Sequence, residues 1–465
     1  MIAPLPEWLR RSVDGARIDL VSSDVGDEAF LCRVRGLGDE PCSAVLLSGG
    51  QLDCSRYSLA AWDPLLIFRS KGDTVYLQTY HGNWEFHGDP LDHLDEVFAA
   101  LRPAYPLMLR PFCGGAVGYF AYDLKNSIER LPQTAVDDRD LPDIFLFFPS
   151  QMLLHDRQTR TLHHVVLEDG QGSPIRTPTP APVLRLGPLT SNFTHDAYIE
   201  AVKRVRQYIR AGDVYQVNLS QRFCFPFEGS PFTLWEHLYA LNPAPFYAFI
   251  QAGDHQILST SMERFLFRQG STIETRPIKG TRKRGKTPTE DQKLRQDLCN
   301  SPKDDAELSM IVDLLRNDLG RICRGRTVRV AEHKRLESYQ NVHHLISIVT
   351  GELRDGITHG EMLRGTFPGG SITGCPKVRA MEIIDELEPH VRHVYTGAIG
   401  YLGWHDNVDL NIAIRTALVH QGNCFFSVGG GIVHDSDEED EYQETLHKAR
   451  TLFDLMERLE KNHGR

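Results

Sequence analysis

A stretch rich in proline, glycine, serine and threonine divides this chain into two unlike parts. It runs from Glu168 to Pro188 and is densest over residues 171–182. Proline and glycine disfavour the interiors of helices and strands, and this composition is typical of an exposed, extended connector. We therefore predict an N-terminal region at residues 1–167, a linker at residues 168–190 and a C-terminal region at residues 191–465.

The two regions differ in hydrophobic pattern. The N-terminal part carries short apolar runs separated by turn residues, as at 44–47, 65–68 and 144–148, which predicts a sheet-rich region. The C-terminal part alternates the two periodicities, with helices predicted at 196–211, 304–323, 376–387 and 437–461, and strands at 409–419 and 424–433. The length of 465 residues suggests two to three domain-sized units, or one interleaved domain.

Charge and cysteine usage exclude several classes of function. The formal net charge is −11, which disfavours nucleic acid as a partner. Nine cysteines occur without a Cys-x-x-Cys pair, which argues against a disulfide framework or a zinc site and favours a reducing cytoplasm. The N-terminus lacks the pattern of a signal peptide, and no apolar run is long enough to span a bilayer. We expect a cytoplasmic protein without membrane contact.

Lys279 is the first candidate for chemistry. It stands in Pro277-Ile-Lys-Gly-Thr281, after a β-branched stretch that predicts a strand ending near the proline. A lysine whose backbone is restricted in this way can act as a nucleophile. Taken alone, a solvated lysine is the commoner explanation, and the basic residues at 282–286 favour an exposed loop there.

The last predicted helix places carboxylates on an apolar stripe. Glu441, Glu444, Lys448, Leu452, Leu455 and Leu459 recur at helical spacing. A face that carries three leucines is buried, and unpaired charges on it are costly unless they bind something. A divalent cation is the natural partner for the two glutamates. Glu438, Glu439 and Asp440 we interpret as an acidic first turn favoured by the helix dipole.

Glu307 shares a predicted helix face with Ile311 and Leu314, so it is a second candidate metal ligand. A capping-box role behind Asp304 explains it equally well. Oxygen ligands of this kind suit Mg²⁺.

The Gly-rich loop at 367–377 has the spacing Gly369-x4-Gly374 of a phosphate loop. Cys375 and Pro376 follow where that motif needs lysine and then serine or threonine, so we reject this interpretation. Pro376 instead suits the first turn of a helix at 378–387. The loop amides would then lie at a helix start, where they can bind a carboxylate.

Arg415 and His344 are ambiguous without further context. Arg415 alternates with the apolar residues at 408–414, which predicts that it faces away from the apolar side of a strand. Exposed arginines and buried structural histidines are both common.

In order along residues 192–448, these motifs together resemble the chorismate-utilising enzymes. The lysine version of Pro277–Thr281 resembles the large subunits of aminodeoxychorismate synthase, which serve para-aminobenzoate and folate biosynthesis, whereas anthranilate synthases typically carry alanine there. The resemblance implies an α/β fold of the α+β type, like that of anthranilate synthase component I, with two large antiparallel sheets packed face to face and helices outside.

The resemblance also implies a role for each candidate. Lys279, Glu263 and His344 would be catalytic, with His344 at the ring, and Glu307 and Glu444 would bind Mg²⁺ with Glu441 nearby. Arg415 and Tyr395 would hold the enolpyruvyl carboxylate of chorismate. The remaining substrate contacts would be Thr373, Gly374, Gly429, Gly430 and Lys448.

The expected reaction follows from Gln216 and Lys279. Water-using relatives carry a lysine base where this chain has Gln216, and glutamine cannot take a proton, so ammonia is the expected nucleophile. Lys279 would attack C2 of chorismate, Glu263 would protonate the departing 4-hydroxyl, and ammonia would add at C4. The chain has no Gly-x-Cys-x-Gly elbow, so a partner glutamine amidotransferase is expected to supply the ammonia.

Three alternatives stay open. An anthranilate synthase component I fits nearly every motif except Lys279, and an isochorismate or salicylate synthase fits less well because of Gln216. A non-catalytic regulator that binds chorismate or tryptophan would leave the catalytic motifs unexplained. Relatives also hold tryptophan at an accessory site, for which Leu46–Gly49 and Pro245–Phe246 are the corresponding segments, with the serine shifted.

Overall fold

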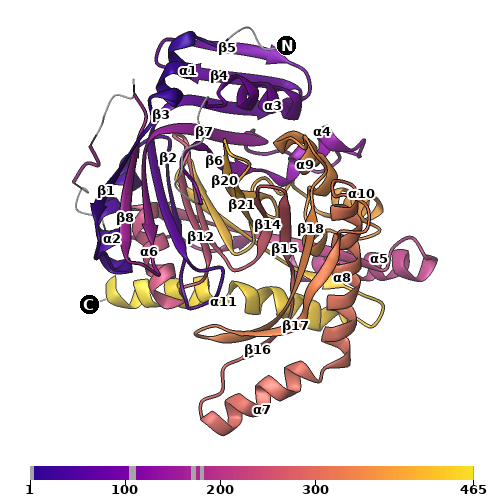
Figure 1. The fold of residues 1–465 in the computed structure, drawn as a ribbon. Helices are drawn as coiled ribbons and strands as arrows, with labels where there is room; N and C mark the ends of the chain where they lie inside the picture. The colour runs from indigo at the N-terminus through magenta and orange to yellow at the C-terminus, as the bar shows by residue number, and fades with distance from the viewer. Residues whose placement is uncertain (1–4, 104–110, 169–173, 178–182, 464–465) are drawn as a thin grey trace.

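The computed structural model describes residues 5–103, 111–168, 174–177 and 183–463. Antiparallel pairings link its strands into one continuous network, and helices lie outside it (Figure 1). This mixed α/β architecture confirms the predicted fold class. In the described part of the chain, no helix combines the length and the apolar character needed to cross a membrane.

The N-terminal region is sheet-rich, as predicted. Its strands are β1 (Arg17–Ser22), β2 (Ser43–Leu47), β3 (Tyr57–Lys71), β4 (Thr74–Thr79), β5 (Gly82–His87), β6 (Gly115–Phe120), β7 (Ile144–Asp156) and β8 (Thr161–Val166). Its helices are α1 (Glu7–Asp14), α2 (Asp27–Val34), α3 (Pro90–Ala100) and α4 (Lys125–Ile128).

The C-terminal region alternates the two kinds of element. Its helices are α5 (His195–Ala211), α6 (Pro231–Leu241), α7 (Pro288–Cys299), α8 (Pro302–Gly320), α9 (His359–Thr366), α10 (Lys377–Leu387) and α11 (Glu438–His463). Its strands are β9 (Arg185–Leu186), β10 (Thr190–Ser191), β11 (Gln216–Glu228), β12 (Phe246–Gln251), β13 (His255–Ser261), β14 (Arg264–Gln269), β15 (Thr272–Arg276), β16 (Ile278–Lys283), β17 (Arg329–Ser338), β18 (Val342–Glu352), β19 (Gly374–Cys375), β20 (Ala398–Gly403), β21 (Val408–Ile412), β22 (Thr416–His420) and β23 (Asn423–Ile432).

The two regions share strand pairings. β2 pairs with β12, so that Leu47 lies opposite Tyr247, and β6 pairs with β20, so that Phe120 lies opposite Ala398. The linker predicted at 168–190 falls partly outside the described residues, and its described end forms β9, which pairs with β11.

Alternation along the shared strands builds two hydrophobic cores. On β12, Ala248 and Ile250 belong to one core, and Phe249 between them belongs to the other. The second core lies against α2 and α6, whose Phe30 and Trp235 are fully buried. The sheet is therefore apolar on both faces.

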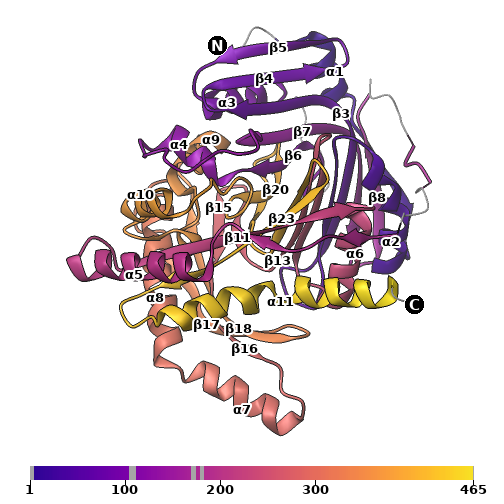
Figure 2. The ribbon, with the colours of Figure 1, turned by 180° about the vertical axis from the view of Figure 1, so that it is seen from behind.

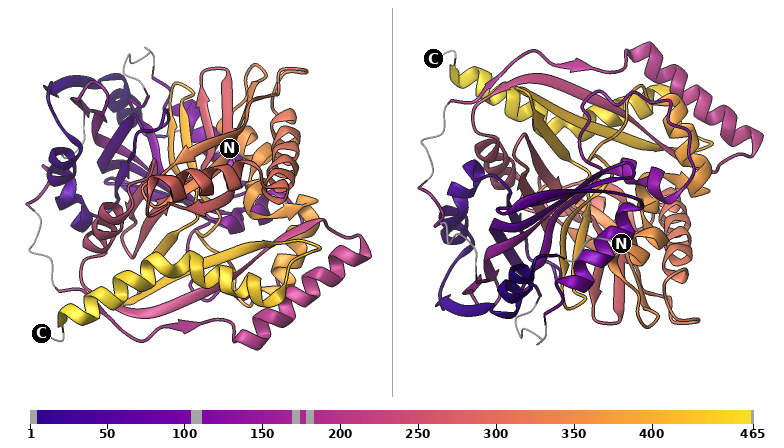
Figure 3. Two further views of the ribbon diagram at one scale, coloured as in Figure 1. Left: turned by 90° about the horizontal axis from the view of Figure 1, so that it is seen from below. Right: turned by 90° about the horizontal axis from the view of Figure 1, so that it is seen from above.

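Helices α5 and α11 pack along β11 and β23 (Figures 2 and 3). Thr194 caps the start of α5, its hydroxyl accepting from the Ala197 amide, and Gly212 ends that helix at φ +84°. The four predicted helices are confirmed as α5, α8, α10 and α11, with ends shifted by a few residues.

The continuous strand predicted over 409–419 is wrong. β21 ends at Ile412 and β22 begins at Thr416, and Arg415 between them has φ +51°, outside the extended region. Arg415 therefore lies in a bend, and alternation along a strand does not set its direction.

Candidate active site

Lys279 lies at the start of β16, immediately after Pro277 has separated this strand from β15. The ladder between β16 and β18 shifts register from Lys279 to Thr281. Gly280 between them has φ +79°, and a Cβ there would come within 3.0 Å of the Asp304 Cβ on α8. A glycine is needed at position 280 for two reasons: the backbone has a positive φ there, and β16 lies too close to α8 to leave room for a side chain.

Glu263, which precedes β14, is a buried carboxyl group close to Lys279. Burial raises its pKa to about 7, although the hydrogen bond from Ser371 and the charge of Lys279 act against this rise. The Ser371 hydroxyl donates to Oε1 at 2.5 Å. Near neutral pH this group can therefore hold a proton and release it, as a general acid must.

Ser371 is a contributor that the sequence analysis did not single out. It lies in the Gly-rich loop at 367–377, within a 3₁₀ turn over Gly370–Ile372. The only sign of Ser371 in the sequence is its position in the Gly-rich loop, because its closeness to Glu263 depends on the fold.

Two carboxylates of α11 meet above Gly430. A Cβ at that position would lie 2.9 Å from Oε2 of Glu441 and 3.8 Å from Oε1 of Glu444. Glu441 accepts from the Ser436 hydroxyl at 2.6 Å through Oε1, while its buried Oε2 has no hydrogen-bond partner among the described residues. Burial, and then the charge of Glu444, raise the pKa of Glu441. The free oxygen and the paired negative charges fit a bound cation.

Lysines surround Glu444. Burial acts to raise its pKa, but Lys448 and then Lys279 and Lys303 reverse that effect, so the pKa lies below its usual value. Lys448 Nζ lies 2.5 Å from Glu444 Oε1 and donates to the Gly429 carbonyl at 2.8 Å. Lys279 thus lies within electrostatic reach of both Glu263 and Glu444.

The buried face of α11 is rotated from the predicted stripe. Glu441, Thr445, Ala449 and Leu452 are buried, whereas the Glu444 side chain is 50% exposed and that of Lys448 33%. Glu444 and Lys448 therefore border the buried face instead of centring it. The side chains of Leu455 and Leu459 lie outside the described residues.

Glu307 is half-buried on α8, which packs against β16 and β18. Across the described ranges, no three acidic, histidine or cysteine side chains are close enough to hold a metal by themselves. The structure thus brings Glu441 and Glu444 together, and Glu307 as a third ligand stays a prediction.

Arg415 carries a guanidinium that makes no ion pair with any described residue. Its Nη1 donates to the Lys448 carbonyl, and no carboxylate of the described chain forms a salt bridge with it. Burial lowers its pKa, which nearby Tyr395 and Tyr247 partly offset. Burial raises the pKa of Tyr395, so its hydroxyl keeps its proton and can donate it in a hydrogen bond. A guanidinium without a carboxylate partner, beside a protonated hydroxyl, favours an anionic ligand.

His344 faces the same space from β18. Thr281 Oγ1 lies 2.9 Å from its Nδ1, and its buried Nε2 has no partner within the described structure. Burial, and then the Arg415 charge, lower the His344 pKa to about 4, so the ring is neutral at physiological pH. The Nε2 atom is thus available to a ligand.

The predicted backbone contacts lie beside β11. Gly374 pairs with Val217, and Gly429 and Gly430 pair with Ser220 and Leu219. Thr373 is fully buried, and its carbonyl accepts from the Asn218 amide at 2.8 Å. The glycines let neighbouring groups approach closely.

Gln216 lies at the start of β11 with its side chain buried. A Cβ at Gly431 would come within 2.4 Å of Gln216 Nε2, and Gln216 Oε1 has no partner in the described residues. The amide therefore lies beside the glycine strand of the candidate site.

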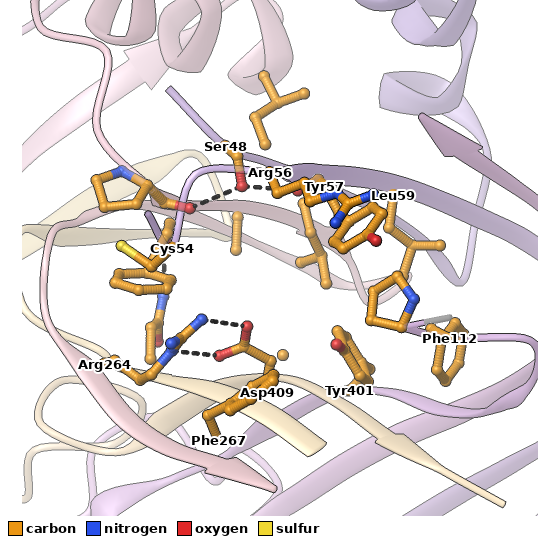
Figure 4. Close-up of a pocket in the computed structure, with 18 of the residues that line it drawn as sticks. Ser48, Cys54, Arg56, Tyr57, Leu59, Phe112, Arg264, Phe267, Tyr401 and Asp409 are labelled. Atoms are coloured by element: carbon orange, nitrogen blue, oxygen red, sulfur yellow. Dashed lines mark hydrogen bonds and ion pairs between the residues drawn. The ribbon is translucent and has the colours of Figure 1, made fainter. Parts of the chain in front are cut away.

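A separate cavity of about 310 Å³ lies among β2, β12 and β21 (Figure 4). The segments predicted for an accessory site line it together through Leu46, Leu47, Ser48, Pro245 and Phe246. Ser48 Oγ donates to the Tyr57 carbonyl at 2.6 Å. Arg264 on its wall makes a two-pronged contact with Asp409, at 3.0 and 2.9 Å.

Comparison with known proteins gives the class to which this fold and site belong. Residues 50–454 match the model of the chorismate binding enzyme family. The chain therefore belongs to the chorismate binding enzymes.

Particular relatives carry two different names. The chain is 41% identical over 429 residues to aminodeoxychorismate synthase component 1 of Escherichia coli, covering 89% of this chain and 93% of that protein. It is 39% identical over 434 residues to anthranilate synthase component 1 of Thermus thermophilus, covering 90% and 93%. The crystal structure of anthranilate synthase component I from Streptococcus pneumoniae superposes with a TM-score of 0.76 at 32% identity, covering 86% and 92%.

Proposed function

We propose that this chain is the large subunit of an aminodeoxychorismate synthase. It would aminate chorismate at C4 to give 4-amino-4-deoxychorismate, the precursor of para-aminobenzoate. Because relatives named for both aminations are about equally similar, the proposal is carried by one observation: a lysine, Lys279, lies within electrostatic reach of both Glu263 and Glu444.

The chemistry assigns a step to each group. Lys279 Nζ forms a bond to C2, the ring double bonds shift, and the C4–O bond breaks as Glu263 gives its proton to the departing hydroxide, releasing water. Ammonia then bonds to C4, the double bonds shift back, and the C2–N bond to Lys279 breaks. Glu263 regains a proton from the added ammonium, so the cycle closes without an oxidant or reductant.

Chorismate would be bound by the polar and charged groups of the site that lack protein partners in the described structure. Arg415 and Tyr395 would take the enolpyruvyl carboxylate, and His344 Nε2 would orient the ring. Glu441 and Glu444, with Glu307, would hold Mg²⁺. When bound, Mg²⁺ neutralises and orients the ring carboxylate.

Ammonia would come from a separate glutamine amidotransferase subunit. The relatives' name, component 1, is that of one part of a two-part enzyme, and this chain has no Gly-x-Cys-x-Gly elbow. Glutamine-driven turnover by the purified chain alone would contradict this.

The cavity of about 310 Å³ would hold tryptophan. The predicted segments 46–49 and 245–246 meet there, and the wall includes the aromatic rings of Phe112, Phe246 and Tyr401. An indole suits such a mixed aromatic and polar lining.

Product analysis tests the proposal. The purified chain is incubated with chorismate, Mg²⁺ and ammonium salt, with and without an aminodeoxychorismate lyase, and the products are separated by chromatography. A 4-amino product that the lyase converts to para-aminobenzoate is expected. Anthranilate as the product would instead assign the chain to the ortho reaction.

A further inference from the structure

A fully buried guanidinium lies behind the proposed substrate contacts. Arg392 follows α10, and its side chain is only 2% exposed. Its five N–H groups all have acceptors, which is the full donor capacity of arginine. The acceptors are Glu388 Oε2 (2.9 Å from Nε), Glu388 Oε1 and the Asn218 carbonyl (both 2.6 Å from Nη2), and the Ile372 carbonyl and Thr396 Oγ1 (3.1 and 3.3 Å from Nη1).

Glu388 extends this network to β11. Its Oε1 also accepts from the amide and the hydroxyl of Ser220, both at 2.8 Å. The ion pair between Arg392 and Glu388 thus holds β11 at two points. The planar guanidinium and the carboxylate form hydrogen bonds in set directions. The pair therefore fixes the distances between the groups it joins, in addition to neutralising their charges.

Each anchored residue adjoins a proposed substrate contact. Ile372 precedes Thr373 in the Gly-rich loop, and Thr396 follows Tyr395 in the chain. Ser220 lies opposite Gly429 in the ladder between β11 and β23. One side chain therefore joins three segments that must keep their spacing to bind one ligand.

The N-terminal region supports Arg392 from the other side. The Tyr122 ring lies 4.8 Å from the guanidinium carbon, and the Tyr122 amide donates to the His393 carbonyl at 2.7 Å. The Asp123 carboxylate accepts from the His393 amide at 2.8 Å. Arg392 is thus held between the two regions.

We propose that Arg392, clamped by Glu388, is a positioning residue for chorismate. It contacts no substrate itself, and it sets the spacing of the loop at Thr373, the segment at Tyr395 and the strand at Gly429. This inference rests on the proposed function, in which those segments bind chorismate.

Arg392→Lys tests the proposal, because lysine keeps the charge and loses the planar fork. We expect KM for chorismate to rise roughly tenfold or more, because the three segments that bind it lose their fixed spacing, with a smaller change in kcat. KM and kcat are measured in the ammonium-driven assay, and chorismate binding is measured by calorimetry. A merely structural role would lower the active fraction and the unfolding temperature without changing KM.

Arg268→Lys is the matched control. Arg268 is also a buried arginine: it donates to the carbonyls of Gly270 and Ile357, both at 3.0 Å, and lies 3.3 Å from Asp406. It adjoins none of the three segments, so this variant should lose stability and keep its KM. An equal rise in KM in both lysine variants would overturn the proposal.

Glu388→Gln provides a second variant if Arg392→Lys does not fold. It keeps the shape of the side chain, removes its charge and replaces one of its two accepting oxygens with an N–H donor, so KM should rise in the same direction. A wild-type KM in folded Glu388→Gln and folded Arg392→Lys would overturn the proposal. The identity of the product is decided separately, because KM for chorismate can be compared whichever carbon is aminated.

Discussion

The candidate active site and the accessory cavity each contain an arginine, and the two arginines differ in their partners. Arg264, at the cavity wall, donates to Asp409 through Nε and Nη2 and to Glu274 through Nη1 at 2.9 Å. Arg415, in the candidate active site, donates only to the Lys448 carbonyl among the described residues. Arg264 is therefore neutralised by carboxylates, whereas within the described residues Arg415 is not.

The difference indicates what each space is built to bind. A buried charge or polar atom without a partner costs free energy, so it persists where a ligand supplies the partner. In the candidate active site, His344 Nε2, Gln216 Oε1 and Glu441 Oε2 are also buried without partners in the described structure. A charged ligand suits this site, whereas the cavity suits a ligand that brings mainly apolar surface.

The largest effect is expected from Lys279→Ala. Loss of the nucleophile should abolish formation of the 4-amino product, because ammonia alone cannot direct substitution to C4 through the two-step route. Chromatography of the products measures this. Lys283→Ala, an exposed lysine on the same strand, is the control and should keep wild-type turnover. Full para-amination by Lys279→Ala would refute the mechanism.

Arg264→Met should lower the free energy of unfolding by about 3–5 kcal/mol, because it leaves the largely buried Asp409 carboxylate without its two-pronged partner, whereas Glu274 keeps Arg276. Arg415→Met should leave that free energy unchanged or raise it, because the removed charge has no ion pair in the described part of the chain. Denaturant unfolding of both variants measures the contrast. Equal losses of stability would break the comparison between the two sites.

Arg415→Met should raise KM for chorismate by about 100-fold, as for two lost hydrogen bonds to a carboxylate. Steady-state kinetics measures this change, and wild-type KM in a folded variant would remove Arg415 from the substrate contacts. Arg268→Met serves as a control outside the site.

The pH dependence of kcat should follow Glu263. Its proton is present below its pKa of about 7, so turnover should fall as pH rises through that value. His344, with a pKa of about 4, is already neutral in this range. Ser371→Ala removes a hydrogen bond that favours the carboxylate, so it should move the decline upward by roughly one pH unit. A downward shift would contradict this assignment.

The raised pKa of Glu263 also makes the free energy of unfolding depend on pH. The folded state holds the Glu263 proton more tightly than the unfolded state does, so this contribution is complete below the unfolded pKa and is lost as pH rises through about 7. Glu263→Gln should flatten both the kinetic and the stability dependence in this window.

The smallest effect is expected in the accessory cavity. Saturating tryptophan should stabilise the protein by about 1–3 kcal/mol, seen as a rise in unfolding temperature. Leu46→Trp, which places an indole in the cavity, should abolish that rise and change KM for chorismate less than twofold or so, since the cavity is separate from the substrate site. An unchanged rise in the variant would place tryptophan elsewhere.

Local periodicity was sufficient for some elements and insufficient for others. It predicted α5, α8, α10 and α11 because helical spacing is a property of neighbouring residues. It failed at Arg415, where a bend interrupts two strands that look continuous in the sequence. It also gave no sign of the pairing between Leu47 and Tyr247, since strand partners so far apart leave no local pattern.

The candidate site was predictable mainly as a set of residue types. The motif resemblance selected Lys279, Glu263, Glu444 and Arg415. The structure links these groups in pairs: Glu263 with Lys279, Lys279 with Glu444, and Glu444 with Arg415. The resemblance did not select Arg392, because a residue that acts through backbone carbonyls has partners that any sequence could supply.

The pairing of β6 with β20 also determines when this protein can fold. β6 cannot pair with β20 until the chain has been synthesised beyond Ala398, the partner of Phe120. At about 5–20 residues per second, this edge of β6 stays unpaired for tens of seconds or so. An open apolar strand edge is a site for aggregation. The nascent chain is therefore most exposed to aggregation before β20 has left the ribosome.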